Sequence, residues 1–300
     1  MMSGNHDVLV VGSANLDVSV PVEHLAVPGE TVLGGDALWS PGGKGANQAV
    51  AAARLGRSVA FAGCVGADAA GQQLLDALAV DGVTFAGRVI KDVPTGLAMI
   101  AVAADGENSI TVSPGTNARL APDDVGAAVD ALSPTVVLAQ FEVPLAALAS
   151  AGGSGRLIIN PAPAVGPSAE LSAALDIASI VVPNQGELAQ LLGVDTARSQ
   201  DDLVDQARAL PVETVVVTLG ATGALVVEGA SVLMVPSVPV DAVDTTAAGD
   251  AFCGGLADGI ADGLSVADAA RWAVRVAAVA VTRRGAQQSL GTRAEVLALG

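Results

Sequence analysis

Short, wholly apolar runs recur along the chain, and most of them are separated by stretches with helical periodicity. A short apolar run bounded by turn residues is typical of a strand buried on both faces of a parallel sheet. The apolar runs are 8–12, 59–63, 135–140, 156–160, 180–184 and 214–220. The helical patterns are 46–56, 68–80, 122–132, 144–151, 185–192, 199–210, 249–262 and 265–283. This alternation predicts an α/β fold in which helices cover a mostly parallel sheet.

Two segments interrupt the alternation. Residues 16–38 contain short strand-like pieces and no helical pattern, and residues 96–113 form an expected hairpin around the turn DGEN. Together these segments are predicted to form a small β-sheet that projects from the main body. Because no linker or repeat divides the rest of the chain, we expect a single domain over 1–300 that carries this β-lid.

Composition narrows the possible partners and the expected location. A net charge of −17 argues against binding to nucleic acid, which requires a basic surface. No apolar run approaches the roughly 18 residues of a membrane span, and the start MMSGNHDVLVVG lacks the basic segment of a signal peptide. Two cysteines indicate no disulfide framework, so a cytoplasmic location is expected. The acidity favours a GC-rich genome over a saline habitat, since only 15% of residues are charged.

The histidine positions restrict the chemistry. Both histidines, His6 and His24, lie near the start of the chain. A histidine-based catalytic triad or metal cage is therefore not expected. Catalysis would instead depend on carboxylates, backbone dipoles, Lys, Arg or a hydrated metal ion.

A glycine-rich turn opens the first helical pattern, in the stretch PGGKGANQAVAAARLG at 41–56. Such a turn can bind phosphate through free N–H groups at a helix start. A Walker loop has four residues between its first glycine and its Gly-Lys pair, and Ser or Thr follows the lysine. Here Gly45 follows Lys44 instead. A dinucleotide fingerprint should follow the first strand, where GSANLD stands instead. Neither common nucleotide motif is present.

A second glycine turn, VDTTAAGDAFCGG at 243–255, also leads into a helical pattern. The small residues Ala247, Ala248 and Gly249 allow backbone N–H groups to approach an anion closely. Asp250 follows them and could accept a proton from an attacking hydroxyl. Alternatively, this carboxylate simply stabilises the helix dipole.

In their order, these motifs resemble those of the ribokinase-type (PfkB) carbohydrate kinases. The matching segments cover almost the whole chain: 12–17, 28–35, 42–56, 160–164, 183–187, 217–224, 244–255 and 280–289. The resemblance implies a three-layer, Rossmann-like sheet with helices on both faces and a β-lid, the ribokinase-like fold. It also implies an ATP-dependent kinase that phosphorylates the 5-hydroxyl of D-ribose to give D-ribose 5-phosphate. The alternatives are a sibling kinase for deoxyribose, another pentose or hexose, or a nucleoside, and a non-catalytic sugar-sensing module.

The resemblance assigns the first glycine turn to the sugar and the second to the transferred phosphoryl group. Asp250 would be the catalytic base, and the N–H groups of Ala247, Ala248 and Gly249 would stabilise the charge on the phosphoryl oxygens. Asn15 and Asp17 follow the first strand, at the edge where α/β sheets bind ligands. The implied sugar-binding residues are Asn15, Asp17, Gly43, Lys44, Gly45, Asn47, Glu142 and Asp250.

The nucleotide positions follow from the same resemblance. The implied ATP contacts are Asn184, Thr218, Leu219, Gly220, Ala221, Thr222, Gly223, Gly249 and Asp250. Asn184 and Glu187, in PNQGE, would order Mg²⁺ through water. Val274 stands where the family often has His or Asn near the adenine, so nucleotide preference stays open.

A monovalent-cation site and a dimer complete these expectations. The implied potassium ligands are the Asp244 side chain, the carbonyls of Thr246, Ala280, Arg283 and Gly285, and the Ser289 hydroxyl. An ion there would fix the loop that forms the anion hole. The β-lid, 16–38 with 96–113, would close over the sugar and pair with its copy in a homodimer.

Overall fold

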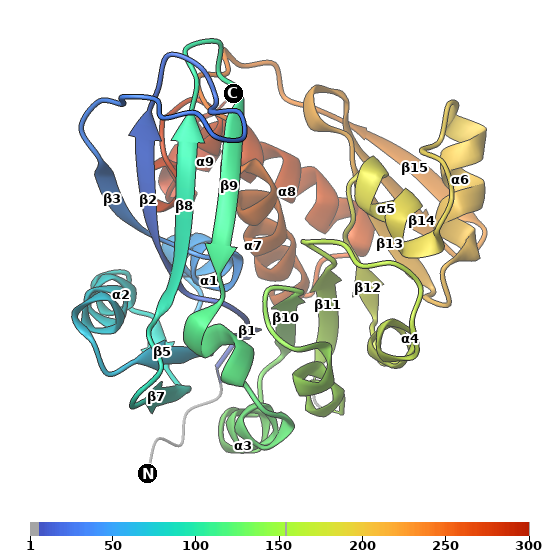
Figure 1. Cartoon of the computed structure of the whole chain (residues 1–300). Coiled ribbons are helices and arrows are strands. Elements are labelled where there is room, and N and C mark those ends of the chain that lie inside the picture. Colours follow the sequence, from blue (N-terminus) through green and yellow to red (C-terminus); the bar gives the residue numbers. More distant parts are fainter. Residues whose placement is uncertain (1–5, 154, 300) are drawn as a thin grey trace.

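A nine-stranded sheet forms the centre of the computed structural model, which describes residues 6–153 and 155–299 (Figure 1). Its strands are β1 (Val8–Val11), β4 (Val59–Ala62), β6 (Thr84–Phe85), β10 (Val136–Gln140), β11 (Arg156–Asn160), β12 (Ile180–Val181), β13 (Thr214–Thr218), β14 (Gly223–Glu228) and β15 (Ser231–Pro236). Their order is β15-β14-β13-β12-β11-β10-β1-β4-β6, and pairing is parallel from β6 to β13 and antiparallel beyond. The first five residues, on which the signal-peptide expectation partly depends, lie outside the described residues.

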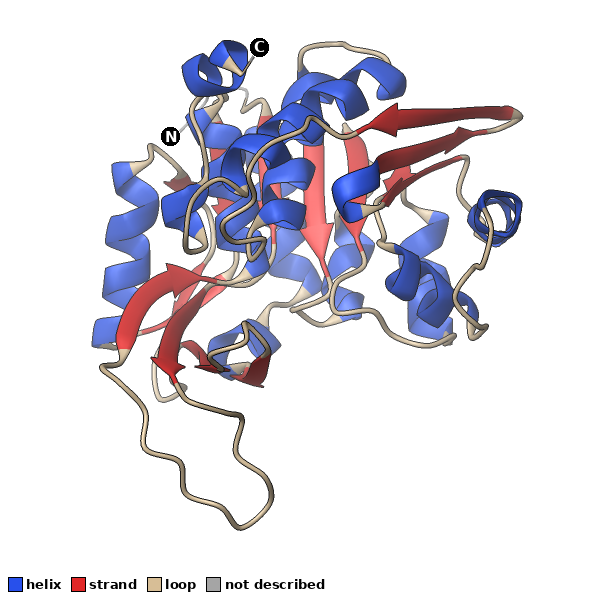
Figure 2. Cartoon of the chain, turned by 90° about the horizontal axis from the view of Figure 1, so that it is seen from above, coloured by secondary structure: helices blue, strands red, loops and turns tan. Residues whose placement is uncertain are grey.

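Helices cover both faces of this sheet (Figures 1 and 2). They are α1 (Lys44–Arg54), α2 (Ala69–Val80), α3 (Pro122–Leu132), α4 (Ala169–Asp176), α5 (Gln185–Leu192), α6 (Gln200–Ala209), α7 (Ala248–Ala261), α8 (Val266–Ala280) and α9 (Arg293–Ala298). Val8 and Val10 of β1 pack in one core with α1, α7 and α8, whereas Leu9 and Val11 pack in a second core with α3 to α6. Because both faces of each central strand are buried, its sequence is a continuous apolar run. The predicted three-layer α/β fold is confirmed.

Several local predictions need correction. The helical pattern at 144–151 forms the 3₁₀ helix η2 (Leu145–Ser150), because its bonds close after three residues, from Ala147 N–H to Pro144 O and from Ala151 N–H to Leu148 O. The strand predicted over 180–184 ends at Val181, and the backbone then turns into α5. Helix α4 and the β14–β15 hairpin were not predicted. The β14–β15 hairpin adds antiparallel strands to the edge of the sheet without a helix between them, so the alternation of strands and helices does not indicate it.

The two interrupting segments pair in one small sheet, separate from the central one. Its strands are β2 (Asn15–Pro21), β3 (Leu38–Gly42), β8 (Gly96–Val102) and β9 (Asn108–Ser113). Their order is β3-β2-β8-β9, with β2 and β8 parallel and the other pairs antiparallel. Since β3 extends to Gly42, the first segment continues beyond the predicted limit of 38. The long connection from β2 to β3 projects from this sheet, and Figure 2 shows it as an extended loop.

Shorter elements connect these sheets. A two-stranded sheet pairs β5 (Cys64–Gly66) with β7 (Arg88–Ile90), and the 3₁₀ helices η1 (Gly115–Arg119), η3 (Gly220–Thr222) and η4 (Gln287–Ser289) lie in loops. Helix η1 directly follows β9, so the small sheet returns to the main body at this point. The carboxyl ends of β1 and β10 and the start of α1 meet beside this junction (Figure 1).

Candidate active site

Glycines allow the start of α1 to pack against the turn that follows β1. Gly43 has φ of 88°, and a Cβ atom there would lie 2.7 Å from the backbone nitrogen of Asn15. A Cβ atom on Gly45 would lie 2.6 Å from the backbone nitrogen of Ser13. Only glycine permits this approach of two backbones. The packing sets Lys44 beside the turn, at the edge of the sheet where ligands bind in α/β folds.

Asp250 lies in the first turn of α7 and is buried. Its Oδ2 accepts a hydrogen bond from Asn47 Nδ2 at 2.9 Å, and its Oδ1 accepts one from Gln48 Nε2 at 2.9 Å. Burial raises the pKa of Asp250, although Lys44 and the two amides act in the opposite direction. A carboxylate with a raised pKa accepts a proton more readily near neutral pH. The structure therefore brings Asp250 and Asn47 together in a setting suited to a general base.

Two more carboxylates, Glu142 and Asp17, belong to this acidic site, and Glu142 lies next to Lys44. One oxygen of Glu142 accepts hydrogen bonds from the backbone N–H of Lys44, at 3.0 Å, and from the hydroxyl of Ser13. Burial, followed by the charges of Glu142 and Asp250, raises the pKa of Asp17 to about 7. Burial opposes the charged form of Lys44, but Asp250, Glu142 and then Glu187 outweigh it and raise the pKa of the ammonium group. The lysine thus stays charged at the centre of an acidic site.

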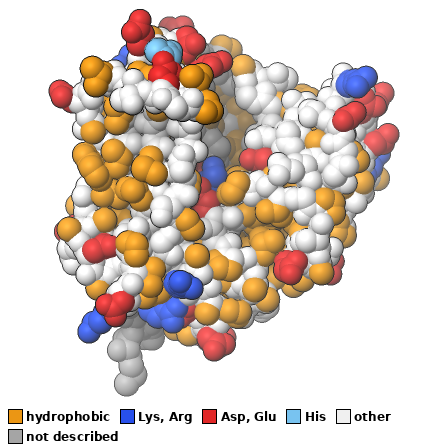
Figure 3. All heavy atoms as spheres, viewed as in Figure 1, with side chains coloured by type: hydrophobic (Ala, Val, Ile, Leu, Met, Phe, Trp, Pro, Cys, Tyr) orange, Lys and Arg blue, Asp and Glu red, His pale blue; other side chains and the backbone are white. Residues whose placement is uncertain are grey.

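A cavity of about 630 Å³ opens beside Asp17, between the small sheet and two loops of the main body. From the small sheet it is lined by Asp17, Ser19, Ser40, Ile100, Val102, Asn108 and Ile110. From the main body it is lined by 242–246 and 284–286. Figure 3 shows the surface hollowed between these parts, with basic and acidic atoms in the hollow. The cavity can hold a ligand of the size of a sugar.

Sequence reasoning missed several amides that support the site. Asn117, in η1, donates from Nδ2 to Asn15 Oδ1 at 2.7 Å and accepts from the backbone N–H of Ala14 at 3.0 Å. It therefore fixes the orientation of Asn15. Gln48 stands inside the GGKGANQ motif, so a polar residue in an otherwise apolar helix could have identified it. Asn160, at the end of β11, opens the matching segment 160–164 but was given no role there, and Gln140, at the end of β10, gave no comparable signal.

The segments expected to bind nucleotide lie side by side. Asn184 and Thr218 form a parallel bridge, and Thr218 N–H donates to the Pro183 carbonyl at 2.9 Å. Gly220 has φ of 55° and open space around it, whereas a Cβ atom on Gly223 would lie 2.0 Å from the Val235 carbonyl oxygen. Gly220 can thus lie against a ligand, while Gly223 is required by the fold. Thr218 and the exposed turn 220–222 lie next to PNQGE, whereas Gly223 is buried behind them.

Asn184 and Glu187 form a reciprocal capping box at the start of α5. Asn184 N–H donates to Glu187 Oε2 at 2.7 Å, and Glu187 N–H donates to Asn184 Oδ1 at 2.8 Å. Burial raises the pKa of Glu187, opposed by the Asn184 N–H and by Lys44. Within residues 6–153 and 155–299, no three His, Cys, Asp or Glu side chains gather as a metal site. Magnesium at this position would depend on phosphate and water ligands as well.

The predicted anion hole lies at the start of α7, but one of its donors already has a partner. Ala248 N–H donates to the Thr245 carbonyl at 3.1 Å. The N–H groups of Gly249 and Asp250 belong to the first turn, where no carbonyl of the same helix accepts them. A Cβ atom on Gly249 would meet only open space. The space for a phosphoryl group is therefore in front of Gly249.

Asp244 joins the two segments that were expected to bind potassium. Its Oδ1 accepts from Thr246 N–H and its Oδ2 accepts from Gly285 N–H, both at 2.9 Å. Burial acts to raise the pKa of Asp244, but these hydrogen bonds and the charge of Arg284 hold it below its usual value. The other expected ligands partly serve the protein itself: the Ala280 carbonyl accepts from Arg283 N–H, and the Ser289 hydroxyl donates to the Ala286 carbonyl.

Val274 is buried in the core on α8, packed with residues of the central sheet and α7. Val274 therefore has a packing role in the structure, and its expected place near adenine stays a prediction.

The fold and the site define a kinase that acts on small hydroxyl compounds. The model of the pfkB family carbohydrate kinases matches residues 5–293, so the chain belongs to this family. A ribokinase from Haemophilus influenzae is 38% identical over 298 residues, which cover 96% of each chain. Arabidopsis thaliana ribokinase complexed with ribose and ATP has a TM-score of 0.86 at 29% identity, covering 99% of each chain. Phosphofructokinase-2 from Escherichia coli in complex with potassium has a TM-score of 0.80 at 25% identity, covering 98% of each chain.

Proposed function

We propose that the protein transfers the γ-phosphoryl group of ATP to the 5-hydroxyl of D-ribose and produces D-ribose 5-phosphate. The observation that carries this proposal is the buried Asp250 at the start of α7, held by the amides of Asn47 and Gln48 beside Lys44. The choice of ribose is supported by the 38% identity to the Haemophilus influenzae ribokinase and by the ribose and ATP complex of the Arabidopsis thaliana ribokinase.

In the proposed reaction, the Asp250 carboxylate accepts the proton of the sugar's primary hydroxyl. The hydroxyl oxygen forms a bond to the γ-phosphorus, and the bond between this phosphorus and the β–γ bridging oxygen breaks to release ADP. The free N–H groups of Gly249 and Asp250 donate to the phosphoryl oxygens as negative charge redistributes there, and Lys44 adds a positive charge nearby. Asn15, Asp17 and Asn47 would orient the sugar hydroxyls.

Magnesium would accompany ATP, with Asn184 and Glu187 holding it through water. These residues suit magnesium, which prefers oxygen ligands. Only Oε2 of Glu187 accepts the hydrogen bond of the capping box, so Oε1 can face a water molecule on the ion. When bound, the ion would neutralise part of the phosphate charge. The capping box fixes both side chains before ATP arrives.

The competing functions make different predictions in one experiment. Purified protein would be given ATP, magnesium and, separately, ribose, deoxyribose, other pentoses, hexoses and nucleosides, with ADP formation as the measured quantity. The proposal expects kcat/KM to be highest for ribose. A higher value for another acceptor would identify a sibling kinase, and absence of ADP formation with every acceptor would favour a sugar-sensing module.

Sugar affinity is expected to rise with pH through about 7. The pKa of Asp17 in the folded protein, about 7, lies above the ordinary value of 3.8. Between these values the folded state holds a proton that the unfolded state has lost, so the free energy of unfolding falls as pH rises. The ionised carboxylate is the form that accepts hydrogen bonds from sugar hydroxyls, so affinity should fall about tenfold per pH unit below 7. Calorimetry on the wild-type protein without ATP would measure this sugar affinity, because the Asp250 charge that helps to raise the pKa of Asp17 is then retained.

The Asp17→Asn change in the same background should give weak ribose binding with little pH dependence. Equal pH dependence in both proteins would assign the titration to another group.

Potassium is expected to increase kcat or nucleotide affinity. The Asp244 and Thr246 oxygens lie a few residues before the free N–H groups of α7, so an ion there would fix their positions. The Escherichia coli phosphofructokinase-2 in complex with potassium supports such a site in this family. Phosphorylation would be titrated with potassium chloride at constant ionic strength, with sodium as the comparison. Asp244→Ala should remove the response, and a flat wild-type response would refute the site.

The small sheet is proposed to close over the sugar as a lid and to pair with its copy in a homodimer. Closure would exclude water from the transfer reaction. Val18, Trp39 and Met99 lie in register on one face of this sheet, and Trp39 and Met99 are 60% and 48% exposed. Hydrophobic side chains gather over this sheet in Figure 3. An apolar face of this kind is typical of an interface.

Light scattering should therefore find a dimer at micromolar concentration, and Trp39→Glu should shift it to a monomer. A fully active wild-type monomer would remove the dimer from the proposal.

A cytoplasmic location is also proposed, since ATP is available there and both cysteines, Cys64 and Cys253, are free and buried. Among the described residues, no helix has both the length and the apolar character needed to cross a membrane.

A further inference from the structure

We infer that Gln48 is a positioning residue, which holds Asp250 Oδ1 as a permanent hydrogen-bond acceptor and so keeps the base oriented and ionised. This inference rests on the proposed role of Asp250. Gln48 is fully buried on α1, and its Nε2 donates both to Asp250 Oδ1, at 2.9 Å, and to Asn160 Oδ1, at 3.1 Å. It acts on the reaction only through Asp250.

The direction of this hydrogen-bond chain is fixed from both ends. Asn160 donates from Nδ2 to the Val182 carbonyl at 2.9 Å, so its Oδ1 must accept. The amide group of Gln48 must therefore turn its NH₂ toward Asn160, and the same NH₂ reaches Asp250. If Asp250 Oδ1 were protonated, its hydrogen would point at this NH₂ group. The arrangement thus favours the ionised form at Oδ1.

The direction of this hydrogen-bond chain leaves one buried acceptor, Gln140 Oε1, without a donor among the described residues. Gln140 donates from Nε2 to Gln48 Oε1 at 2.6 Å, and among the residues that the structure describes its own Oε1 is buried without a partner. If the Gln140 amide were rotated by half a turn, its Oε1 would face Gln48 Oε1, and two acceptors would meet. Rotation of this one amide therefore cannot give the Gln140 oxygen a hydrogen-bond donor. A buried unpaired acceptor is unfavourable, and its presence indicates that the direction of the chain is constrained by Asp250.

Close packing of α1 on α7 brings Gln48 within reach. A Cβ atom on Gly254 would lie 2.5 Å from Ala51 Cβ and 3.1 Å from the Gln48 carbonyl oxygen. The two helices therefore approach at glycine, four residues beyond Asp250. This close approach holds the α1 backbone at Gln48 against α7, within reach of the carboxylate.

The test is the pH dependence of kcat for Gln48→Met at saturating ribose and ATP. Charged groups near Asp250 are Lys44, Glu142 and Asp17, and the Cys253 thiol is also close. Saturating sugar keeps Asp17 ionised, so the acidic limb of kcat reports the base in the complex. Removing a hydrogen bond to a charged group should move this limb upward by about one to two pH units, with kcat recovering at higher pH.

Gln140→Met provides a second variant, since it frees the Gln48 amide without deleting it. A smaller shift in the same direction is expected. Val50→Ala, in the α1 core, is the control for packing alone and should lower Tm without moving the limb. A kcat reduced by one constant factor at every pH in both glutamine variants would overturn the inference. A wild-type protein that phosphorylates no acceptor would instead refute the proposed function and this inference with it.

Discussion

Asp250→Asn is expected to lower kcat by about 10²- to 10⁴-fold, the usual contribution of a general base, while sugar affinity changes little. The amide cannot accept the proton of the sugar hydroxyl. It can keep the hydrogen bond from Gln48, and its NH₂ group would face Asn47. Asn47 Oδ1 is buried and without a partner among the described residues, so a rotated Asn47 amide can accept from this NH₂. The substitution should therefore preserve the shape of the site.

Asp268→Asn is the matched control, because Asp268 lies in the first turn of α8 and is exposed. If Asp250 only stabilised a helix dipole, the two variants would behave alike. ADP formation gives kcat, and calorimetry gives the sugar Kd. Near-normal kcat in Asp250→Asn would place the base elsewhere, whereas a large loss in both variants would indicate general damage to helix starts.

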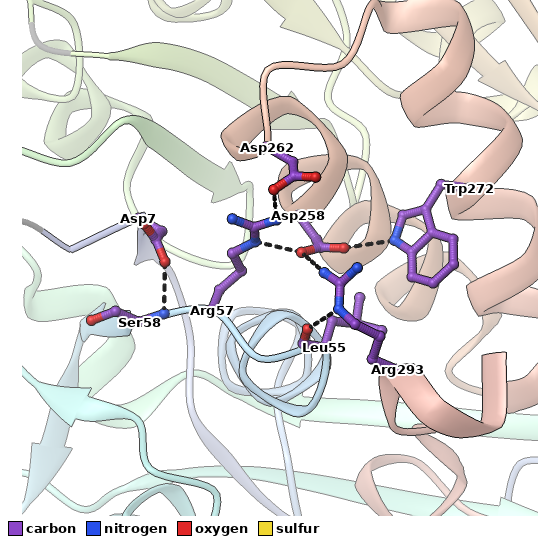
Figure 4. Close-up of polar contacts among 8 residues, drawn as sticks. All are labelled: Asp7, Leu55, Arg57, Ser58, Asp258, Asp262, Trp272 and Arg293. Carbon is purple, nitrogen blue, oxygen red and sulfur yellow. Dashed lines mark hydrogen bonds and ion pairs between the residues drawn. The ribbon is translucent and has the colours of Figure 1, made fainter. Parts of the chain in front are cut away.

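Asp258→Ala is expected to lower the free energy of unfolding by about 3–5 kcal/mol, the usual effect of removing one partner from a buried ionic group. Asp258 is 1% exposed and accepts from three side chains (Figure 4). The donors are Arg57 Nε at 2.5 Å, Arg293 Nη2 at 2.6 Å and Trp272 Nε1 at 2.7 Å. These residues come from the loop after α1, from α9 and from α8, so Asp258 of α7 connects four parts of the chain.

Asp262→Ala tests whether burial is the cause. Asp262 binds the same Arg57 at 2.6 Å, but its side chain is 56% exposed, so its loss should cost only about 0.2–1 kcal/mol. Urea unfolding of both variants measures the difference. Equal costs would show that the buried position of Asp258 adds nothing to its contribution.

The central strands could be predicted from sequence because burial on both faces leaves a direct pattern, as in VLVV of β1 and VVLAQ of β10. The hairpin of the small sheet was also predicted, since DGEN is a strong turn. The break in the α/β alternation at 16–38 and 96–113 only suggested that β2 pairs with β8. Nothing in the sequence of either segment specifies a partner in a distant strand.

For the site, motifs supplied Lys44, Asn47 and Asp250, and the structure brings the last two into contact. The resemblance included Asn160 in a matching segment but gave no role to Asn160 or to Gln140. Each is a single amide at a strand end, and each meets Gln48 from about a hundred residues away. The partner of Ala248 N–H was missed for another reason: the turn from Thr245 forms its own hydrogen bond, which depends on backbone angles that residue types do not specify.

The backbone contact between GGKG and the turn after β1 limits where substrate range can be altered. Gly43 and Gly45 press against Ser13 and Asn15 with no room for even a methyl group, so variants there would disturb the fold before they changed the choice of sugar. Ile100 and Ile110, paired on the small sheet, also line the cavity and have no such backbone contact with the turn after β1. A mutant library aimed at larger or modified sugars should therefore vary these two positions and keep the glycine turn intact.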